Sequence, residues 1–169
     1  MENMKGTLII RVNAIFTALF LITAIISAIV FDQPWKAIAV AVSLGTFAIG
    51  VVAFLWGYWT AVQRSREDNI SVAALYFLID NCAPRDVARR MNVLLVIQVI
   101  GGLATALARP STGAERGSTL AFGILVPMLG LGLNGLWGAY YGTFAPRNGA
   151  SAPEVPTQGA EIEKDGEHD

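Results

Sequence analysis

The chain has 169 residues, of which 54% are hydrophobic and 15% are charged, and its formal net charge at pH 7 is -1. Its mean hydropathy is positive. These values exclude an ordinary soluble domain and indicate an integral membrane protein in a lipid bilayer, for which we expect no nucleic-acid partner.

Four apolar stretches follow one another along the chain, at residues 12–31, 37–60, 91–108 and 119–142. A helix needs about 20 mostly apolar residues to cross a bilayer. The sequence therefore predicts an all-α, polytopic membrane protein, with a four-helix transmembrane domain over residues 1–142.

The basic residues are distributed unevenly between the two sides of these spans. One side holds Lys36, Arg109 and Arg116, and the other holds Lys5, Arg11, Arg64, Arg66, Arg85, Arg89, Arg90, Arg147 and Lys164. Lys and Arg favour the cytoplasmic side, and clusters of Trp and Tyr close the second and fourth spans on that same side. We expect a multi-pass protein of the plasma membrane with both termini in the cytoplasm.

The central cytoplasmic loop, residues 63–90, contains an apolar run at 70–79 that is too short to span. Ser65 followed by Asp68 is typical of a capping box and predicts a helix that starts near Arg66. This short helix should lie in the interface or pack beneath the spans. Pro84 suits the first turn of the helix that follows, with Asp86 favourable at its N-terminus.

Charged side chains in this loop are candidates for contact with a partner or with lipid: Arg64, Arg66, Glu67, Asp68, Arg85, Arg89 and Arg90. Acids nearly balance the arginines, which argues against a polybasic lipid switch. A local salt-bridged surface and a docking edge both remain open for the group from Arg64 to Asp68.

Small and polar residues recur every three or four positions through the fourth span: Gly123, Pro127, Gly130, Asn134, Gly138 and Gly142. Such residues share one face of a helix. Small residues let helix backbones approach closely in lipid, and an asparagine can add a hydrogen bond between helices. The spacing predicts a packing seam.

The alternative for the same span is a helix that Pro127 interrupts around a solute, as in transporters. Gln98, Pro127 and Asn134 would then line the pathway. Ionisable residues near the bilayer midplane usually accompany transport, and these spans contain only neutral polar residues there. The sequence favours the seam.

Residues 143–169 are predicted to form a disordered tail, because they carry an excess of acids together with proline and glycine and have little apolar surface to bury. Cys82 is the single cysteine, so no intramolecular disulfide can form. A small residue in a turn is a better interpretation of Cys82 than a palmitoylated or reactive thiol.

Catalytic patterns are nearly absent. His168, the sole histidine, falls in the predicted tail, and no nucleophile elbow or phosphate-binding motif occurs in a suitable context. We expect no enzyme activity, no metal site and no cofactor.

Two segments, SREDNISVAALYFL and ARPSTGAERGSTLAFGILVPMLGLGLNGLWGAYYGTFAPR, resemble the uncharacterised small alanine-rich integral membrane proteins of actinobacteria. The resemblance covers roughly residues 55–147. It implies a four-helix plasma-membrane protein and carries over no catalytic residue. From the residues themselves we expect an accessory or scaffolding subunit that acts through helix–helix contacts with a membrane-protein partner or in a homo-oligomer. The alternative is a component of a small-solute transporter or channel that works as an oligomer.

Overall fold

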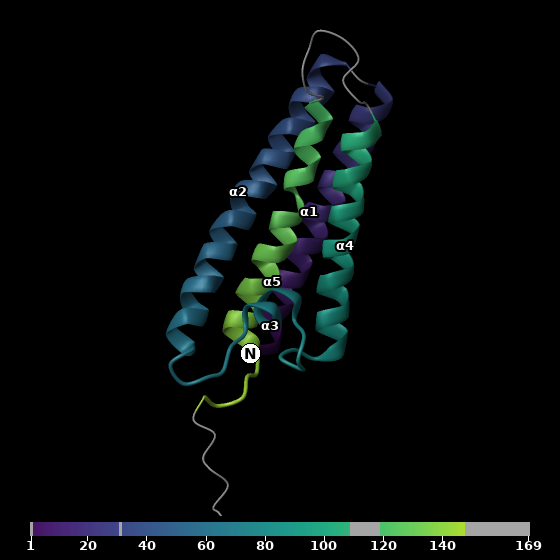
Figure 1. Ribbon diagram of the computed structural model, residues 1–169. Helices are drawn as coiled ribbons and strands as arrows, with labels where there is room; N and C mark the ends of the chain where they lie inside the picture. Colours follow the sequence, from purple (N-terminus) through teal and green to yellow (C-terminus); the bar gives the residue numbers. More distant parts are fainter. Residues whose placement is uncertain (1, 31, 109–118, 148–169) are drawn as a thin grey trace, which may run out of the picture.

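The computed structural model describes residues 2–30, 32–108 and 119–147 as a bundle of long helices (Figure 1). The helices are α1 (Glu2–Val30), α2 (Gln33–Arg64), α3 (Val72–Phe77), α4 (Arg85–Ala108) and α5 (Pro127–Tyr141), with a 3₁₀ helix, η1 (Thr119–Leu125), just before α5. Among these described residues there is no strand, and one isolated bridge joins Asp68 to Pro146.

Four helical segments are long and apolar enough to cross a membrane: Gly6–Val30, Pro34–Arg64, Arg85–Leu107 and Phe122–Tyr141. The prediction of an all-helical chain with four candidate spans is confirmed. The helices extend beyond the apolar stretches at several ends; α1 starts at Glu2 and α2 continues to Arg64. A bilayer offers the backbone no hydrogen-bond partners, so a spanning segment has to satisfy its own, as a helix does.

Both described ends of the chain lie at the same end of the bundle. In Figure 1 the start of α1, the α3 segment and the residues after α5 are all at the bottom, and the α1–α2 connection is at the top. Residues 143–147, the start of the predicted tail, pair with the loop after α2 through backbone hydrogen bonds from Asn69 to Ala145 and from Arg147 to Glu67. The rest of that tail, residues 148–169, lies outside the described residues.

Helix α5 occupies the middle of the bundle between α2 and α4 (Figure 1), and its main neighbour is α2. The two backbones cross where Gly50 meets Gly132. A Cβ at Gly50 would lie 2.5 Å from the backbone nitrogen of Leu129, and one at Gly132 would overlap the carbonyl oxygen of Gly50. Only glycine permits this approach, in which van der Waals contact is the main attraction between helices.

The fourth span is interrupted at Pro127. Residues up to Leu125 form the 3₁₀ helix, and α5 begins at Pro127. Proline lacks the N–H of a regular helical bond and its ring collides with the preceding turn. Tighter bonds replace the regular pattern there, from the Val126 nitrogen to the Gly123 oxygen (3.1 Å) and from the Leu129 nitrogen to the Val126 oxygen (2.9 Å).

The predicted capping box is wrong. Ser65 is the C-cap of α2 and not the start of a helix; the N-cap of the loop helix is Ser71, whose hydroxyl accepts a hydrogen bond from the Ala74 nitrogen. Helix α2 continues through Arg64 because that side chain is anchored on α5, which the local pattern does not reveal. Helix α4 starts at Arg85, directly after Pro84, with Asp86 in its first turn as expected.

Candidate functional site

Gln98 of α4 is the centre of a buried hydrogen-bond network in the bundle. Its side-chain nitrogen donates to Asn13 Oδ1 (2.9 Å) and to Thr17 Oγ1 (2.7 Å), both on α1. Its side-chain oxygen accepts from the Gly130 nitrogen of α5 (3.0 Å). Gln98 and Asn13 have no exposed surface, so these side chains tie three helices together away from solvent.

The bond to Gly130 lies in the first turn of α5, three residues after Pro127. Gln98 gives this N–H an acceptor from the neighbouring helix. A Cβ at Gly130 would lie 2.6 Å from the same Gln98 oxygen, so this position has to be small.

Asn134 connects α5 to α4 and to the loop helix. Its side-chain nitrogen donates to the Tyr76 carbonyl oxygen (3.0 Å) and to Asn92 Oδ1 (3.1 Å). Asn92 in turn donates to the Phe77 carbonyl oxygen (2.6 Å). The Oδ1 atom of Asn134 is buried and has no partner among the described residues. This arrangement holds the end of α3 under the bundle.

The predicted seam faces two different elements. Gly123 and Gly130 lie against Thr105 and Gln98 of α4, while Gly138 lies against Leu75 of α3. Gly142, at the C-cap, lies against Phe144, and Pro127 forms the start of α5 and is half-buried. The closest contact with α2 is made by Gly132, on another face of α5.

Arg64 is anchored at the C-terminal end of α5. It donates from Nη1 to the Ala139 oxygen (2.9 Å) and from Nη2 to the Gly142 oxygen (3.2 Å). The same guanidinium forms a salt bridge with Asp68 (2.8 Å) and lies over the Phe144 ring. A cation at a helix C-terminus satisfies the last carbonyl groups and is stabilised by the helix dipole. Arg64 and Asp68 therefore form a local structural pair.

The remaining charged candidates lie on the surface. Arg66, Glu67, Arg85, Arg89 and Arg90 are all exposed. They surround the same end of the molecule as α3, and the structure brings none of them into the buried networks.

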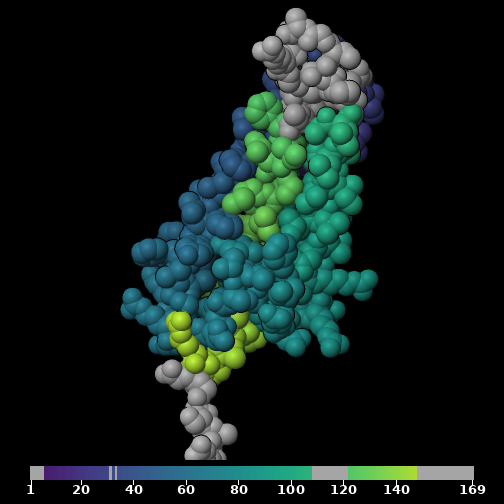
Figure 2. All heavy atoms as spheres, viewed as in Figure 1, coloured from purple at the N-terminus to yellow at the C-terminus, as the bar shows by residue number. Residues whose placement is uncertain are grey.

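The loop from Ser65 to Pro84 covers the lower half of α5. In Figure 2 the green surface of η1 and of the start of α5 is visible in the upper half, and the teal surface of this loop lies over the lower part of α5. Ala74, Leu75 and Tyr76 of α3 are buried. Tyr76 stacks on Phe54 of α2 with ring centroids 4.3 Å apart, and its hydroxyl donates to the Phe54 carbonyl oxygen (3.2 Å).

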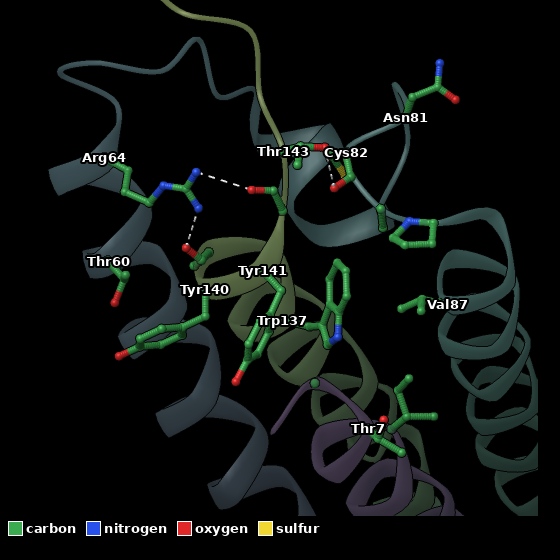
Figure 3. A pocket seen from close by; sticks show the side chains of 16 residues that line it. Thr7, Thr60, Arg64, Asn81, Cys82, Val87, Trp137, Tyr140, Tyr141 and Thr143 are labelled. Carbon is green, nitrogen blue, oxygen red and sulfur yellow. Dashed lines mark hydrogen bonds between the residues drawn. The ribbon is translucent and has the colours of Figure 1, made fainter. Parts of the chain in front are cut away.

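A cavity of about 740 Å³ lies at this end of the bundle (Figure 3). Residues of α1, α2, α4, α5 and the loop before α4 line it. Trp137, Tyr140 and Tyr141 of α5 are arranged along it, with Arg64 on one side and Val87 on the other (Figure 3). This volume is within the range typical of small-molecule pockets.

A second concavity, of about 640 Å³, lies between α2 and α5 on the outside of the bundle. We call it the α2–α5 groove; it is lined by Ala48, Ile49, Val52, Ala53, Trp56, Leu133, Leu136 and Tyr140. One polar contact occurs at its end, where the Trp56 indole donates to the Tyr140 hydroxyl (2.8 Å). The groove is otherwise apolar.

Cys82 is buried in the turn before α4, and its thiol donates to the Ala74 carbonyl oxygen (3.2 Å). Burial, with a further contribution from the carboxylate of Asp80, raises the pKa of this thiol. A thiol needs a lowered pKa and exposure to be reactive. Cys82 has neither, which agrees with the structural interpretation.

Ionisation of the Tyr76 hydroxyl should make the stability of the fold depend on pH in the alkaline range. Burial, followed by the effect of Tyr58, raises its pKa from 10 to about 12. A raised pKa in the folded state stabilises the fold below pH 10, and this contribution is lost as pH rises towards 12. We expect the thermal midpoint of Tyr76→Phe, measured in detergent from pH 9 to 12, to fall less steeply than that of the wild type. Parallel slopes would contradict this assignment.

Sequence reasoning missed Asn13, Thr17 and Tyr76 as parts of the buried networks. A polar residue within a predicted span was the available signal for Asn13 and Thr17, since such groups need partners in lipid. Their partners could not be chosen, because Gln98 follows Asn13 by 85 positions.

Comparisons of this chain with protein-family models, with curated proteins and with solved structures give no match.

Proposed function

We propose that this protein is an accessory or scaffolding subunit of the plasma membrane that acts through helix–helix contacts and not as an enzyme. The observation that supports this most is that several polar side chains of the spans bond to one another inside the bundle. Gln98, Asn13 and Thr17 bond to one another, and Asn134 bonds to Asn92 and the α3 backbone. With these groups engaged inside the bundle, its outer surface is left to carry the function.

The α2–α5 groove is the surface that best fits a partner helix. It is concave and apolar, and Ala48 on its wall allows a close backbone approach. Leu133 and Leu136 offer van der Waals contacts. A membrane-protein partner, or a second copy of this chain, would insert a helix there.

Purification from native membranes in mild detergent after crosslinking tests this function. We expect the wild type to co-purify with a larger membrane complex, and Ala48→Trp, which fills the groove, to lose that partner. Ala104→Trp is the matched control, because Ala104 is an exposed alanine on α4. A wild-type chain that purifies alone, or an Ala48→Trp chain that keeps its partner, would contradict the proposal.

The alternative is a component of a small-solute transporter or channel, and the interrupted fourth span favours it. Broken helices at the middle of a bilayer form binding sites in several transporter folds. Here the N–H of Gly130, near the break, donates to the Gln98 side chain. Solute flux in vesicles that contain only this chain would support the transporter and overturn the accessory role.

We also propose that both ends face the cytoplasm. The shared position of the described ends (Figure 1) is compatible with an even number of crossings, and the Lys and Arg distribution favours this direction. In a Cys82→Ser background, a cysteine at position 151 should be shielded from an impermeant reagent in intact cells, and one at position 111 should be labelled. The reverse pattern would show the opposite orientation.

A further inference from the structure

The 740 Å³ cavity has a partly polar lining. Arg64, Tyr141 and Thr143 are among the residues that line it, while the amide of Asn81 points away from the other lining side chains (Figure 3). Among the described residues that line it, none is Asp or Glu. These groups offer many donors and no carboxylate, so they favour an anion that is rich in acceptor oxygens.

Arg64, although paired with Asp68, is the basic side chain among the described residues that line the cavity. The guanidinium has five N–H donors. Its hydrogen bonds to Asp68, Ala139 and Gly142 use four of them: Nε–H, one on Nη1 and two on Nη2. One Nη1 donor remains, and Asp68 is not among the residues that line the cavity. An acceptor in the cavity can therefore bind Arg64 without breaking its contacts with α5.

The remaining walls are apolar or aromatic. Ile10 of α1, Val87 of α4 and Trp137 of α5 line the cavity from three helices. A small hydrophilic anion would leave this surface unfilled. A ligand with an apolar body would cover it, which gives the hydrophobic contribution to binding.

The position of the cavity favours a membrane lipid as that ligand. It lies at the end of the four candidate spans, among the Trp and Tyr residues typical of a membrane interface. Basic pockets between membrane helices commonly hold the head groups of anionic lipids. We propose that this cavity binds the phosphate head group of an anionic phospholipid, with Arg64 as the phosphate contact and the acyl chains running along the apolar walls.

Native mass spectrometry of the full chain, titrated with dioleoylphosphatidylglycerol or with dioleoylphosphatidylcholine, tests the proposal. We expect the wild type to bind the anionic lipid at least about tenfold more tightly, which corresponds to one charge-assisted hydrogen bond. Val87→Trp fills the cavity while leaving the bonds of Arg64 intact, and Arg64→Gln removes the charge. Both variants should lose the preference.

Two matched controls separate the cavity from general attraction to charge. Arg66→Gln removes one exposed arginine two residues away, and Val93→Trp adds the same bulk to an exposed position of α4; neither residue lines the cavity. Both should keep the preference. Equal binding of the two lipids, or an unchanged preference in Val87→Trp, overturns the proposal even if Arg64→Gln does not fold.

Glycerol phosphate distinguishes a lipid from a soluble phosphate ester. Because the apolar walls contribute to binding, it should not displace phosphatidylglycerol at similar concentrations. Displacement at similar concentrations would assign the site to a soluble ester and overturn the lipid.

Discussion

Gly50→Leu is expected to destabilise the protein by about 3 kcal/mol or more, the upper range for a side chain forced into a packed interior. At this position the α2 backbone lies against Met128 and Leu129 of α5, and a single Cβ would already lie 2.5 Å from backbone atoms. A leucine therefore has to push the two helices apart and removes their contacts along the crossing. The thermal midpoint in detergent and the yield of monodisperse protein measure this loss.

Gly45→Leu is the matched control on the same helix. A Cβ at Gly45 would have nothing within 4 Å, so we expect little change, or a small gain because glycine is a poor helix former. Equal stability of the two leucine variants would show that α2 and α5 do not cross at Gly50.

Gln98→Leu is expected to lower stability by about 2 kcal/mol. The change removes the side-chain partner of the Gly130 N–H on α5 and of Asn13 and Thr17 on α1. An unsatisfied polar group inside the bundle costs about 1 to 3 kcal/mol. Measured side-chain hydrogen bonds in membranes have smaller values, averaging about 0.6 kcal/mol. Because Gln98 forms three such bonds, the sum still exceeds the effect of an ordinary polar substitution.

Gln63→Leu serves as the control, since Gln63 is exposed at the end of α2. It should leave the thermal midpoint nearly unchanged. A Gln98→Leu protein as stable as the wild type would mean that the three hydrogen bonds of Gln98 contribute little to the bundle.

The class of the fold could be predicted from the sequence because it depends on local quantities. Span length and hydropathy are sums over neighbouring residues, and they placed all four candidate spans. The start of α3 was not predictable in the same way. Both Ser65 and Ser71 suit an N-cap, and the choice depends on Arg64, which continues α2 by bonding to carbonyl groups 75 and 78 positions later.

The buried networks show the same limit more clearly. Gln98 and Asn134 were singled out because polar residues are rare in spans, and the sequence left open whether they line a pathway or hold helices together. Their bonds to Asn13 and Asn92 depend on how α1, α4 and α5 are placed in three dimensions. Likewise, the stripe of small residues in the fourth span could not identify α3 and α4 as its neighbours. It also did not include Gly132, which makes the contact with α2.

The central place of α5 has a consequence for biogenesis. This helix is the last of the four spans to leave the ribosome, although it packs against α2 through residues that were synthesised about 80 positions earlier. Contacts between such distant segments form late, since the chain between them has to be ordered first. During translation α1, α2 and α4 therefore enter the bilayer before α5 has been synthesised. Until then, the side-chain oxygen of Gln98 lacks its hydrogen bond from the Gly130 nitrogen. Assembly of the bundle should accordingly be a single late step, and a ribosome stalled before residue 127 should leave three inserted but loosely associated helices.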